Sequence, residues 1–252
     1  MNWIPSILGL VIVLTAAGVI AAGALPRARQ SRGAFRFIPA AQRLRRALGL
    51  AVEDGTRVHV SLGKAGLTTP EGASALAGLS ALERVAQLSS VSDRPPVATS
   101  GDGALAILSQ DTLRAAHRAA NAPELYDPDR GRLTGPTPMS FVAGALPILS
   151  DERVSANLLI GNFGPEAALL AEAAERQGAF TLAASDALPT QAVFFALSDE
   201  PLVGEELFAL PAYLQAGPAH QFSLRAQDLL RWGIVLLMIV LGLLAVFGVL
   251  VL

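Results

Sequence analysis

Residues 56–88 read TRVHVSLGKAGLTTPEGASALAGLSALERVAQL, and this stretch decides the fold class. Its first seven residues alternate, with valine and leucine on one side of the chain and mostly polar residues on the other. This alternation predicts a β-strand over Thr56–Leu62. After a glycine-rich loop, apolar residues recur at steps of three and four, which predicts a helix over Pro70–Leu88. A strand that leads through a short loop into a helix is the first half of a strand–helix–strand unit.

The alternation of strands and helices continues along the chain. Further strands are expected over Pro96–Ser100, Val154–Ile160 and Ala179–Ala184, and further helices over Gly103–Ala120, Pro138–Leu149, Pro165–Gln177 and Glu205–Leu214. Tyr126–Gly135 is rich in turn residues and is expected to include a loop, and Gln191–Ala196 is compatible with either type of element. This pattern predicts an α/β fold with a mostly parallel sheet and helices on both faces, a Rossmann-like arrangement.

Both ends of the chain are apolar. No charged residue occurs from Ile4 to Leu25 or from Trp232 to Leu252. As a helix the first run spans roughly 33 Å, enough to cross the hydrocarbon core of a bilayer. Basic residues follow this run and none precedes it, which favours a retained anchor over a cleaved signal peptide. We therefore expect two transmembrane helices that flank the α/β domain.

The arginines next to these runs set an expected orientation. Basic residues stay on the cytoplasmic side of a membrane, so the middle of the chain is expected in the cytoplasm and both termini outside the plasma membrane. Tryptophan is stable at the membrane–water interface. The residues expected at the two interfaces are Trp3, Arg27, Arg29, Arg32, Arg36, Arg231 and Trp232.

These expectations divide the chain into four parts. Residues 1–25 are the N-terminal transmembrane helix, 26–50 a basic juxtamembrane segment, 51–222 the cytoplasmic α/β domain, and 223–252 the C-terminal transmembrane helix with a short lead-in. Within the basic segment, residues 43–50 have an amphipathic pattern. That pattern either lies against anionic lipid headgroups or serves only to fix the topology.

Composition excludes several kinds of chemistry. The chain of 252 residues has no cysteine, which excludes disulfides, thiolate catalysis and cysteine-ligated metal sites. Its formal net charge of −2 gives no indication of a nucleic-acid partner. His59, His117 and His220 lack the spacing of metal ligands, so each is expected on a strand face or at the surface. No nucleophile elbow of the G-x-S-x-G type is present, so no catalytic residue and no metal site is assigned.

The strand-to-helix connections carry the candidate site. In an open parallel sheet, ligands bind beyond the carboxyl ends of the strands. Glycine there lets backbone N–H groups approach a bound anion, Lys64 supplies a positive charge, and Asp102 or Asp186 can bind ribose hydroxyls or a metal. The candidate ligand-binding residues are Gly63, Lys64, Gly66, Ser100, Gly101, Asp102, Gly161, Asn162, Gly164 and Asp186.

A second interpretation of the same glycines stays open. Parallel α/β domains use glycine at tight strand-to-helix turns whether or not a ligand binds there. The sequence contains neither the phosphate-loop motif G-x-x-x-x-G-K-[ST] nor the dinucleotide motif G-x-G-x-x-G. The loops therefore form either a pocket for a nucleotide or phosphorylated metabolite, or turns alone.

The α/β domain also resembles a known family. The resemblance begins at Arg57–Gly63 and continues through Gly66 and Leu67 into the helix around Leu76–Leu79. Further matching residues are Arg84, Val85, Ala86, Ser92, Asp93, Pro95, Pro96, Tyr126, Asp127, Pro128, Ala156, Asn157, Gly161, Phe163, Gly164, Gly204, Glu205, Glu206, Pro218, Ala219, His220, Ala226, Gln227 and Asp228. The family is an uncharacterised group of bacterial and archaeal membrane proteins, known only as a domain of unknown function. The resemblance implies a membrane-tethered domain and assigns no activity or cofactor.

These observations favour a membrane-anchored, non-enzymatic scaffold or assembly subunit. Its expected partners are the lipid bilayer and either further copies of the chain or other membrane subunits. The alternative is a membrane-tethered sensor that binds a nucleotide or another small anionic metabolite at the glycine-rich loops. A third hypothesis is an enzyme that uses Lys64 and Asp102. The sequence identifies no cofactor.

Overall fold

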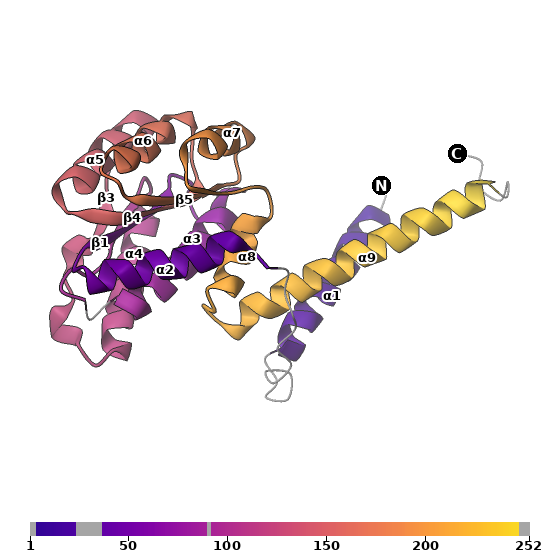
Figure 1. Cartoon of the computed structure of the whole chain (residues 1–252). Coiled ribbons are helices and arrows are strands. Elements are labelled where there is room, and N and C mark those ends of the chain that lie inside the picture. The colour runs from indigo at the N-terminus through magenta and orange to yellow at the C-terminus, as the bar shows by residue number, and fades with distance from the viewer. Residues whose placement is uncertain (1–3, 24–36, 90–91, 247–252) are drawn as a thin grey trace. The chain divides into compact units, whose positions relative to one another are not determined.

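The computed structural model describes residues 4–23, 37–89 and 92–246 (Figure 1). The chain divides into two compact units. One unit is residues 36–216, and the other consists of both ends of the chain, 1–35 and 217–252.

A single parallel sheet of six strands forms the centre of the 36–216 unit within the described residues. The strands are β1 (Arg57–Gly63), β2 (Val97–Ser100), β3 (Gly131–Leu133), β4 (Val154–Asn162), β5 (Phe180–Ser185) and β6 (Glu200–Leu202). Their order across the sheet is β3-β2-β1-β4-β5-β6. The chain therefore moves outward from β1 to β3, returns to the middle at β4, and then moves outward in the opposite direction. The α/β class and the parallel sheet expected from the sequence are confirmed.

Helices cover both faces of this sheet (Figure 1). One face packs against α2 (Pro39–Glu53), α3 (Gly72–Ser89), α4 (Gly103–Ala119) and α8 (Glu206–Tyr213). The other face packs against α5 (Pro138–Asp151), α6 (Ala168–Arg176) and α7 (Leu188–Leu197). Among the described residues, the connections also contain short 3₁₀ turns: η2 (Pro123–Leu125), η3 (Pro128–Arg130) and η4 (Pro165–Ala167).

Two short strands differ from the sequence expectation. β3 forms inside the turn-rich segment Tyr126–Gly135, and β6 lies between α7 and α8, where no strand was expected. Each has three residues and lies at one edge of the sheet. Three residues are too few for an alternating pattern to be recognised, which explains why the sequence does not predict them. The ambiguous segment Gln191–Ala196 is helical and belongs to α7.

The helix α2 belongs to the folded unit. Its buried residues include Leu44 and Leu48, which join the core together with strand residues such as Val58. On its polar side, Arg43 forms an ion pair with Glu200. The sequence pattern predicts that the α/β domain starts at residue 51 and is compatible with lipid contact for residues 43–50. The structure differs because the apolar side of this amphipathic helix packs on the sheet.

The unit made of the chain ends contains α1 (Ile4–Gly23) and α9 (Pro218–Val246), which contact each other. Among the residues that the structure describes, no helix is both long enough and apolar enough for a membrane span. Arg231 and Trp232 lie on α9, and both are exposed. The other residues expected at the membrane interfaces lie outside the described residues, as do 24–25 and 247–252 of the expected spans: Trp3, Arg27, Arg29, Arg32 and Arg36.

Candidate functional site

The loops that follow β1 and β4 meet where the strand order reverses. The backbone N–H of Lys64 donates to the carbonyl of Asn162 at 3.0 Å. The loop after β2 joins them, because the N–H of Gly101 donates to the carbonyl of Gly63 at 2.8 Å. Loops far apart in the sequence thus come together at the carboxyl edge of the sheet. We call the residues that they bring together at the ends of β1 and β4 the central crevice: Gly63, Lys64, Gly101, Gly161, Asn162, Gly164 and Glu166.

Two glycines of this crevice are required by close packing of the backbone. A Cβ atom on Gly63 would lie 2.2 Å from the carbonyl oxygen of Asn162, and one on Gly161 would lie 2.2 Å from that of Leu62. Gly63 also has a φ of +75°, in the left-handed region that favours glycine. For these two positions, the packing of β1 against β4 is sufficient to explain glycine.

Gly164 differs, because its missing side chain leaves room for a charged group. A Cβ atom there would lie 2.1 Å from Oε2 of Glu166, so this carboxylate occupies the space. Oε1 of the same carboxylate lies 3.0 Å from Nζ of Lys64. The Lys64 side chain is 27% exposed and that of Glu166 14%. The positive charge of Lys64 is therefore paired with a partly buried carboxylate.

The remaining predicted side chains also have partners within the chain. Asp102 caps α4 by accepting a hydrogen bond from the N–H of Leu105 at 3.0 Å. Nδ2 of Asn162 donates to Oδ1 of Asp186 at 2.7 Å. Ser100 donates its hydroxyl to the carbonyl of Asp102 at 3.2 Å. A Cβ atom on Gly66 would lie 3.7 Å from the Asp102 carboxylate, which places the first loop beside the second.

A row of buried polar side chains crosses the sheet on the face that α5, α6 and α7 cover. Nδ1 of His59 lies 2.7 Å from Oδ1 of Asn157, and Nε2 lies 2.9 Å from Oγ1 of Thr99. An amide oxygen only accepts, so Nδ1 carries the hydrogen and Thr99 donates its hydroxyl to Nε2. Burial lowers the pKa of His59 to about 4, although the hydrogen bond that His59 donates to Asn157 opposes that shift. His59 is therefore neutral at pH 7.

A cluster of ion pairs centres on Glu152, directly after α5. Its carboxylate lies 3.0 Å from Nη1 of Arg57, 2.5 Å from Nη1 of Arg132 and 3.6 Å from Nη1 of Arg130. The side chain of Arg57, at the start of β1, is only 8% exposed. The cluster thus ties together the beginning of β1, the edge strand β3 and the end of α5.

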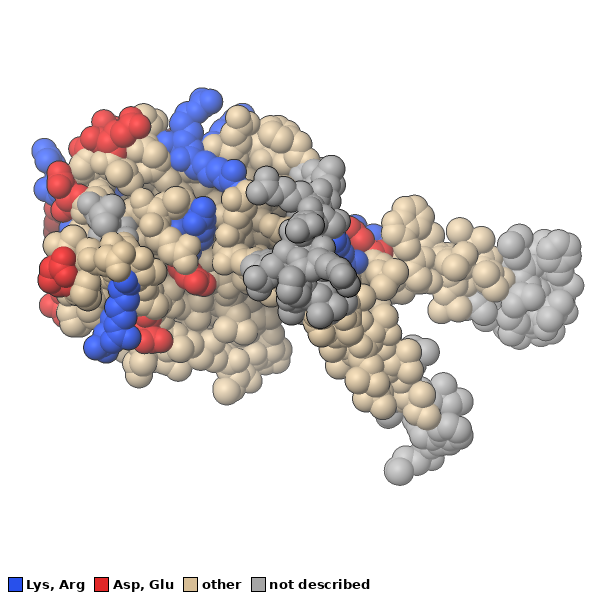
Figure 2. All heavy atoms as spheres, turned by 90° about the horizontal axis from the view of Figure 1, so that it is seen from below, with Lys and Arg blue, Asp and Glu red and all other residues tan. Residues whose placement is uncertain are grey.

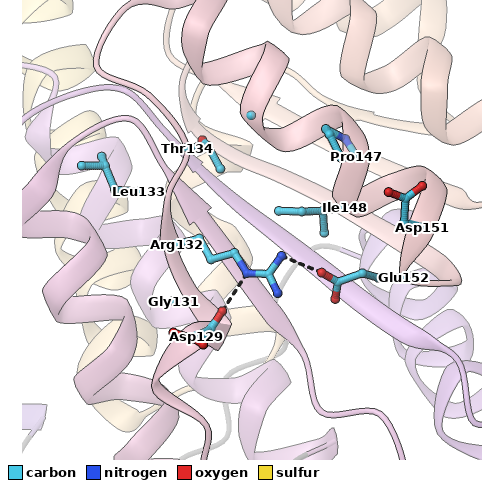
Figure 3. A pocket seen from close by; sticks show the side chains of 10 residues that line it. Asp129, Gly131, Arg132, Leu133, Thr134, Pro147, Ile148, Asp151 and Glu152 are labelled. Carbon is cyan, nitrogen blue, oxygen red and sulfur yellow. Dashed lines mark hydrogen bonds and ion pairs between the residues drawn. The ribbon is translucent and has the colours of Figure 1, made fainter.

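An open cleft of about 690 Å³ lies beside this cluster, between α5 and β3 (Figure 3). The Arg132 guanidinium lies in the middle of the view, where Nε donates to the carbonyl of Asp129 and Nη1 to Glu152. Asp129, Asp151 and Glu152 also line the cleft, so acidic side chains outnumber its one basic side chain. Its arginine is already held by two acceptors, and we assign the Glu152 cluster a structural role.

Sequence reasoning missed Glu166 and the Glu152 cluster. Glu166 follows Pro165 at the start of a helical segment, where an acidic residue is expected to interact with the helix dipole. Arg57, His59 and Ser61 did carry a signal, because a parallel sheet covered on both faces buries both sides of its central strands. A polar side of β1 therefore requires buried partners, but the sequence does not say which residues they are.

A family model described as "Domain of unknown function (DUF6754)" matches residues 4–251. This match covers nearly the whole chain, and the chain belongs to that family. No curated protein and no solved structure matches it.

Proposed function

We propose that this member of a family of unknown function is a membrane-tethered sensor that binds a nucleotide or another small anionic metabolite in the central crevice. The strand order carries the proposal: β1 and β4 are neighbours, and the chain leaves them in opposite directions. In open α/β sheets, ligands bind outside the carboxyl ends of the strands at such a reversal.

Several groups at the crevice suit an anion that carries hydroxyl groups. Lys64 provides the positive charge, and its side chain is accessible to solvent. Asp186 and Asn162 lie 2.7 Å apart on the same edge and offer both acceptors and donors to a sugar. These groups come from three different connections, so a ligand that bound them all would bridge β1, β4 and β5.

The membrane tether rests on the ends of the sequence. Both expected spans lack charged residues. In the sequence, arginines adjoin the end of each span that leads into the α/β unit. In the unit made of the chain ends, α1 contacts α9, as expected of two segments that cross a bilayer together. We propose that the α/β unit faces the cytoplasm and that both termini lie outside the plasma membrane.

Calorimetry of the full-length chain in lipid nanodiscs tests the binding proposal. The panel contains nucleoside mono-, di- and triphosphates and sugar phosphates. We expect one class to bind, and Lys64→Ala to weaken that binding by about tenfold or more, because a hydrogen bond to a charged group is lost. Arg176→Ala removes one exposed positive charge from α6, outside the crevice, and is the matched control. A folded chain that releases no heat with any member of the panel contradicts the proposal.

A scaffold or assembly subunit is the second candidate function. It is favoured by a specific observation: the charged side chains at the crevice already have partners within the chain, as in the Lys64–Glu166 and Asn162–Asp186 pairs. Its proposed partners are further copies of the chain or other membrane subunits. The mass of the solubilised full-length protein tests it, since a strict monomer without co-purifying partners would count against a scaffold.

A further inference from the structure

We infer that the central crevice contains an oxyanion subsite that Glu166 fills from within the chain, and that the ligand carries a phosphate or carboxylate group that displaces it. This inference rests on the proposed sensor function. It adds the chemical class of the group that binds, the residues that hold it, and an internal competitor.

The position of the Glu166 carboxylate defines the subsite. Oε1 lies 3.0 Å from Nζ of Lys64, and Oε2 lies where a side chain on residue 164 would be, 2.1 Å from the position of a Cβ atom. The carboxylate thus lies between a cation and a backbone position that has no side chain. The same place accepts another group with two or three oxygens, because a lysine forms charge-assisted hydrogen bonds with phosphate as well as with carboxylate.

The neighbouring groups narrow the ligand further. Asp102 and Asp186 lie at the same edge of the sheet, and neither carboxylate has an ion pair among the described residues. Negative charge there disfavours a second anionic group and favours hydroxyls as donors. A sugar phosphate or the ribose phosphate part of a nucleotide combines one oxyanion with hydroxyl groups, and this is the class that we assign.

The competition has a measurable consequence. A side chain held close to its partner acts at an effective concentration in the mM range, so a free anion must exceed that competition to reach Lys64. Removing the Glu166 charge should therefore strengthen binding of an external anion. Gly164→Ala should do the same by another route, because its Cβ atom displaces the carboxylate while residue 164 keeps an extended φ of −93° that alanine adopts.

Lys64 makes the experiment specific, because it is the only lysine of the chain. The full-length protein is treated with an amine-reactive ester, and acylation of Nζ is followed by mass spectrometry of the Lys64 peptide, with inorganic phosphate as the competing anion. The variants are Glu166→Gln and Gly164→Ala. Glu172→Gln is the matched control, since it removes an exposed carboxylate of α6 that pairs with Arg176.

We expect acylation at least about threefold faster in Glu166→Gln and Gly164→Ala than in the wild type and Glu172→Gln, since Lys64 loses its ion pair. Phosphate should then protect Lys64 at about tenfold lower concentration in Glu166→Gln than in the wild type. Unchanged acylation in both variants overturns the inference. Equal phosphate protection of wild type and Glu166→Gln overturns the competition but leaves the sensor proposal standing. If acylation is faster in Glu166→Gln and Gly164→Ala but phosphate protects Lys64 in none of the proteins, both this inference and the sensor proposal are overturned.

Discussion

Gly63 and Gly164 lie in the same crevice but face different atoms. A Cβ atom on Gly63 meets a backbone carbonyl at 2.2 Å, and the residue has a φ of +75°. The backbone cannot move away without separating β1 from β4. We therefore predict that Gly63→Ala lowers the free energy of unfolding by about 3 kcal/mol, through steric overlap and strain.

Urea denaturation of the full-length chain measures this difference. Gly103→Ala is the control, because a Cβ atom there meets nothing within 4 Å and the residue begins α4. Gly164→Ala should resemble the control, since it displaces only the end of a flexible side chain. A Gly63→Ala variant as stable as Gly103→Ala would show that β1 and β4 do not approach each other this closely at Gly63.

The buried His59 predicts a pH dependence of stability. Its pKa is about 4 in the folded chain and 6.5 when unfolded, so the unfolded chain takes up the proton first as the pH falls. The contribution of neutral His59 to the free energy of unfolding is complete above pH 6.5 and is lost between pH 6.5 and pH 4. The expected loss is about 2 kcal/mol between pH 7 and pH 5.

The measurement compares wild type with His59→Gln by denaturation at pH 7 and pH 5. The amide of glutamine can still donate toward Asn157 and accept from Thr99, but it does not titrate. The variant should lose clearly less stability than the wild type over this range. An equal loss in both proteins would assign the pH dependence to other groups.

At the scale of elements, the Glu152 cluster joins β1, β3 and α5. Glu152→Gln keeps the shape of the side chain but leaves the buried Arg57 without its counter-charge. We predict a loss of about 3 kcal/mol in the free energy of unfolding, because an uncompensated buried charge remains. Glu172→Gln, in an exposed pair on α6, should cost less than about 0.5 kcal/mol. If Glu152→Gln costs as little as Glu172→Gln, the cluster does not stabilise the fold.

Helix α2 provides a second test at this scale. Leu44 is fully buried in the core, whereas Leu50 on the same helix is 51% exposed. We predict that Leu44→Ala costs about 3 kcal/mol and Leu50→Ala less than about 0.5 kcal/mol. Both are measured by urea denaturation of the full-length chain. Similar small effects would indicate that α2 does not belong to the folded unit.

The longer elements were predictable because their patterns extend over many residues. β1 and α3 have clear periods of two and of three to four, and their observed bounds differ from the prediction by one or two residues. β3 and β6 were not predictable, because they have three residues each. For α2, the sequence shows an amphipathic pattern but not the surface on which the helix packs. An amphipathic helix shows in its sequence which side is apolar, but not whether that side packs on a sheet or on lipid.

For the whole molecule, the proposed topology predicts protection of the α/β unit. Protease added to intact spheroplasts should leave residues 36–216 uncut, because both proposed spans keep that unit in the cytoplasm. Lysed spheroplasts serve as the control and should show cleavage. The charges visible on the α/β unit in Figure 2 include exposed arginines, so trypsin has sites once it gains access. Cleavage in intact spheroplasts would contradict the topology.

The candidate site was predictable in its place but not in its contacts. Parallel strands end at one edge of the sheet, so the sequence alone brought the loops with Lys64, Asp102 and Asn162 together. The partner of Lys64 is Glu166, which is 102 residues away. Such a pairing depends on the order of the strands, and that order follows from the packing of the whole sheet rather than from any local pattern.

The central claim is that an anionic group binds beside Lys64 between β1 and β4. A density map of the full-length protein, purified from its own cells without added ligand, tests this claim most directly. We expect density for an oxyanion beside Lys64 and next to Gly164, with the Glu166 side chain turned away from Lys64. A map with Glu166 on Lys64 and a ligand or partner protein bound elsewhere would contradict it.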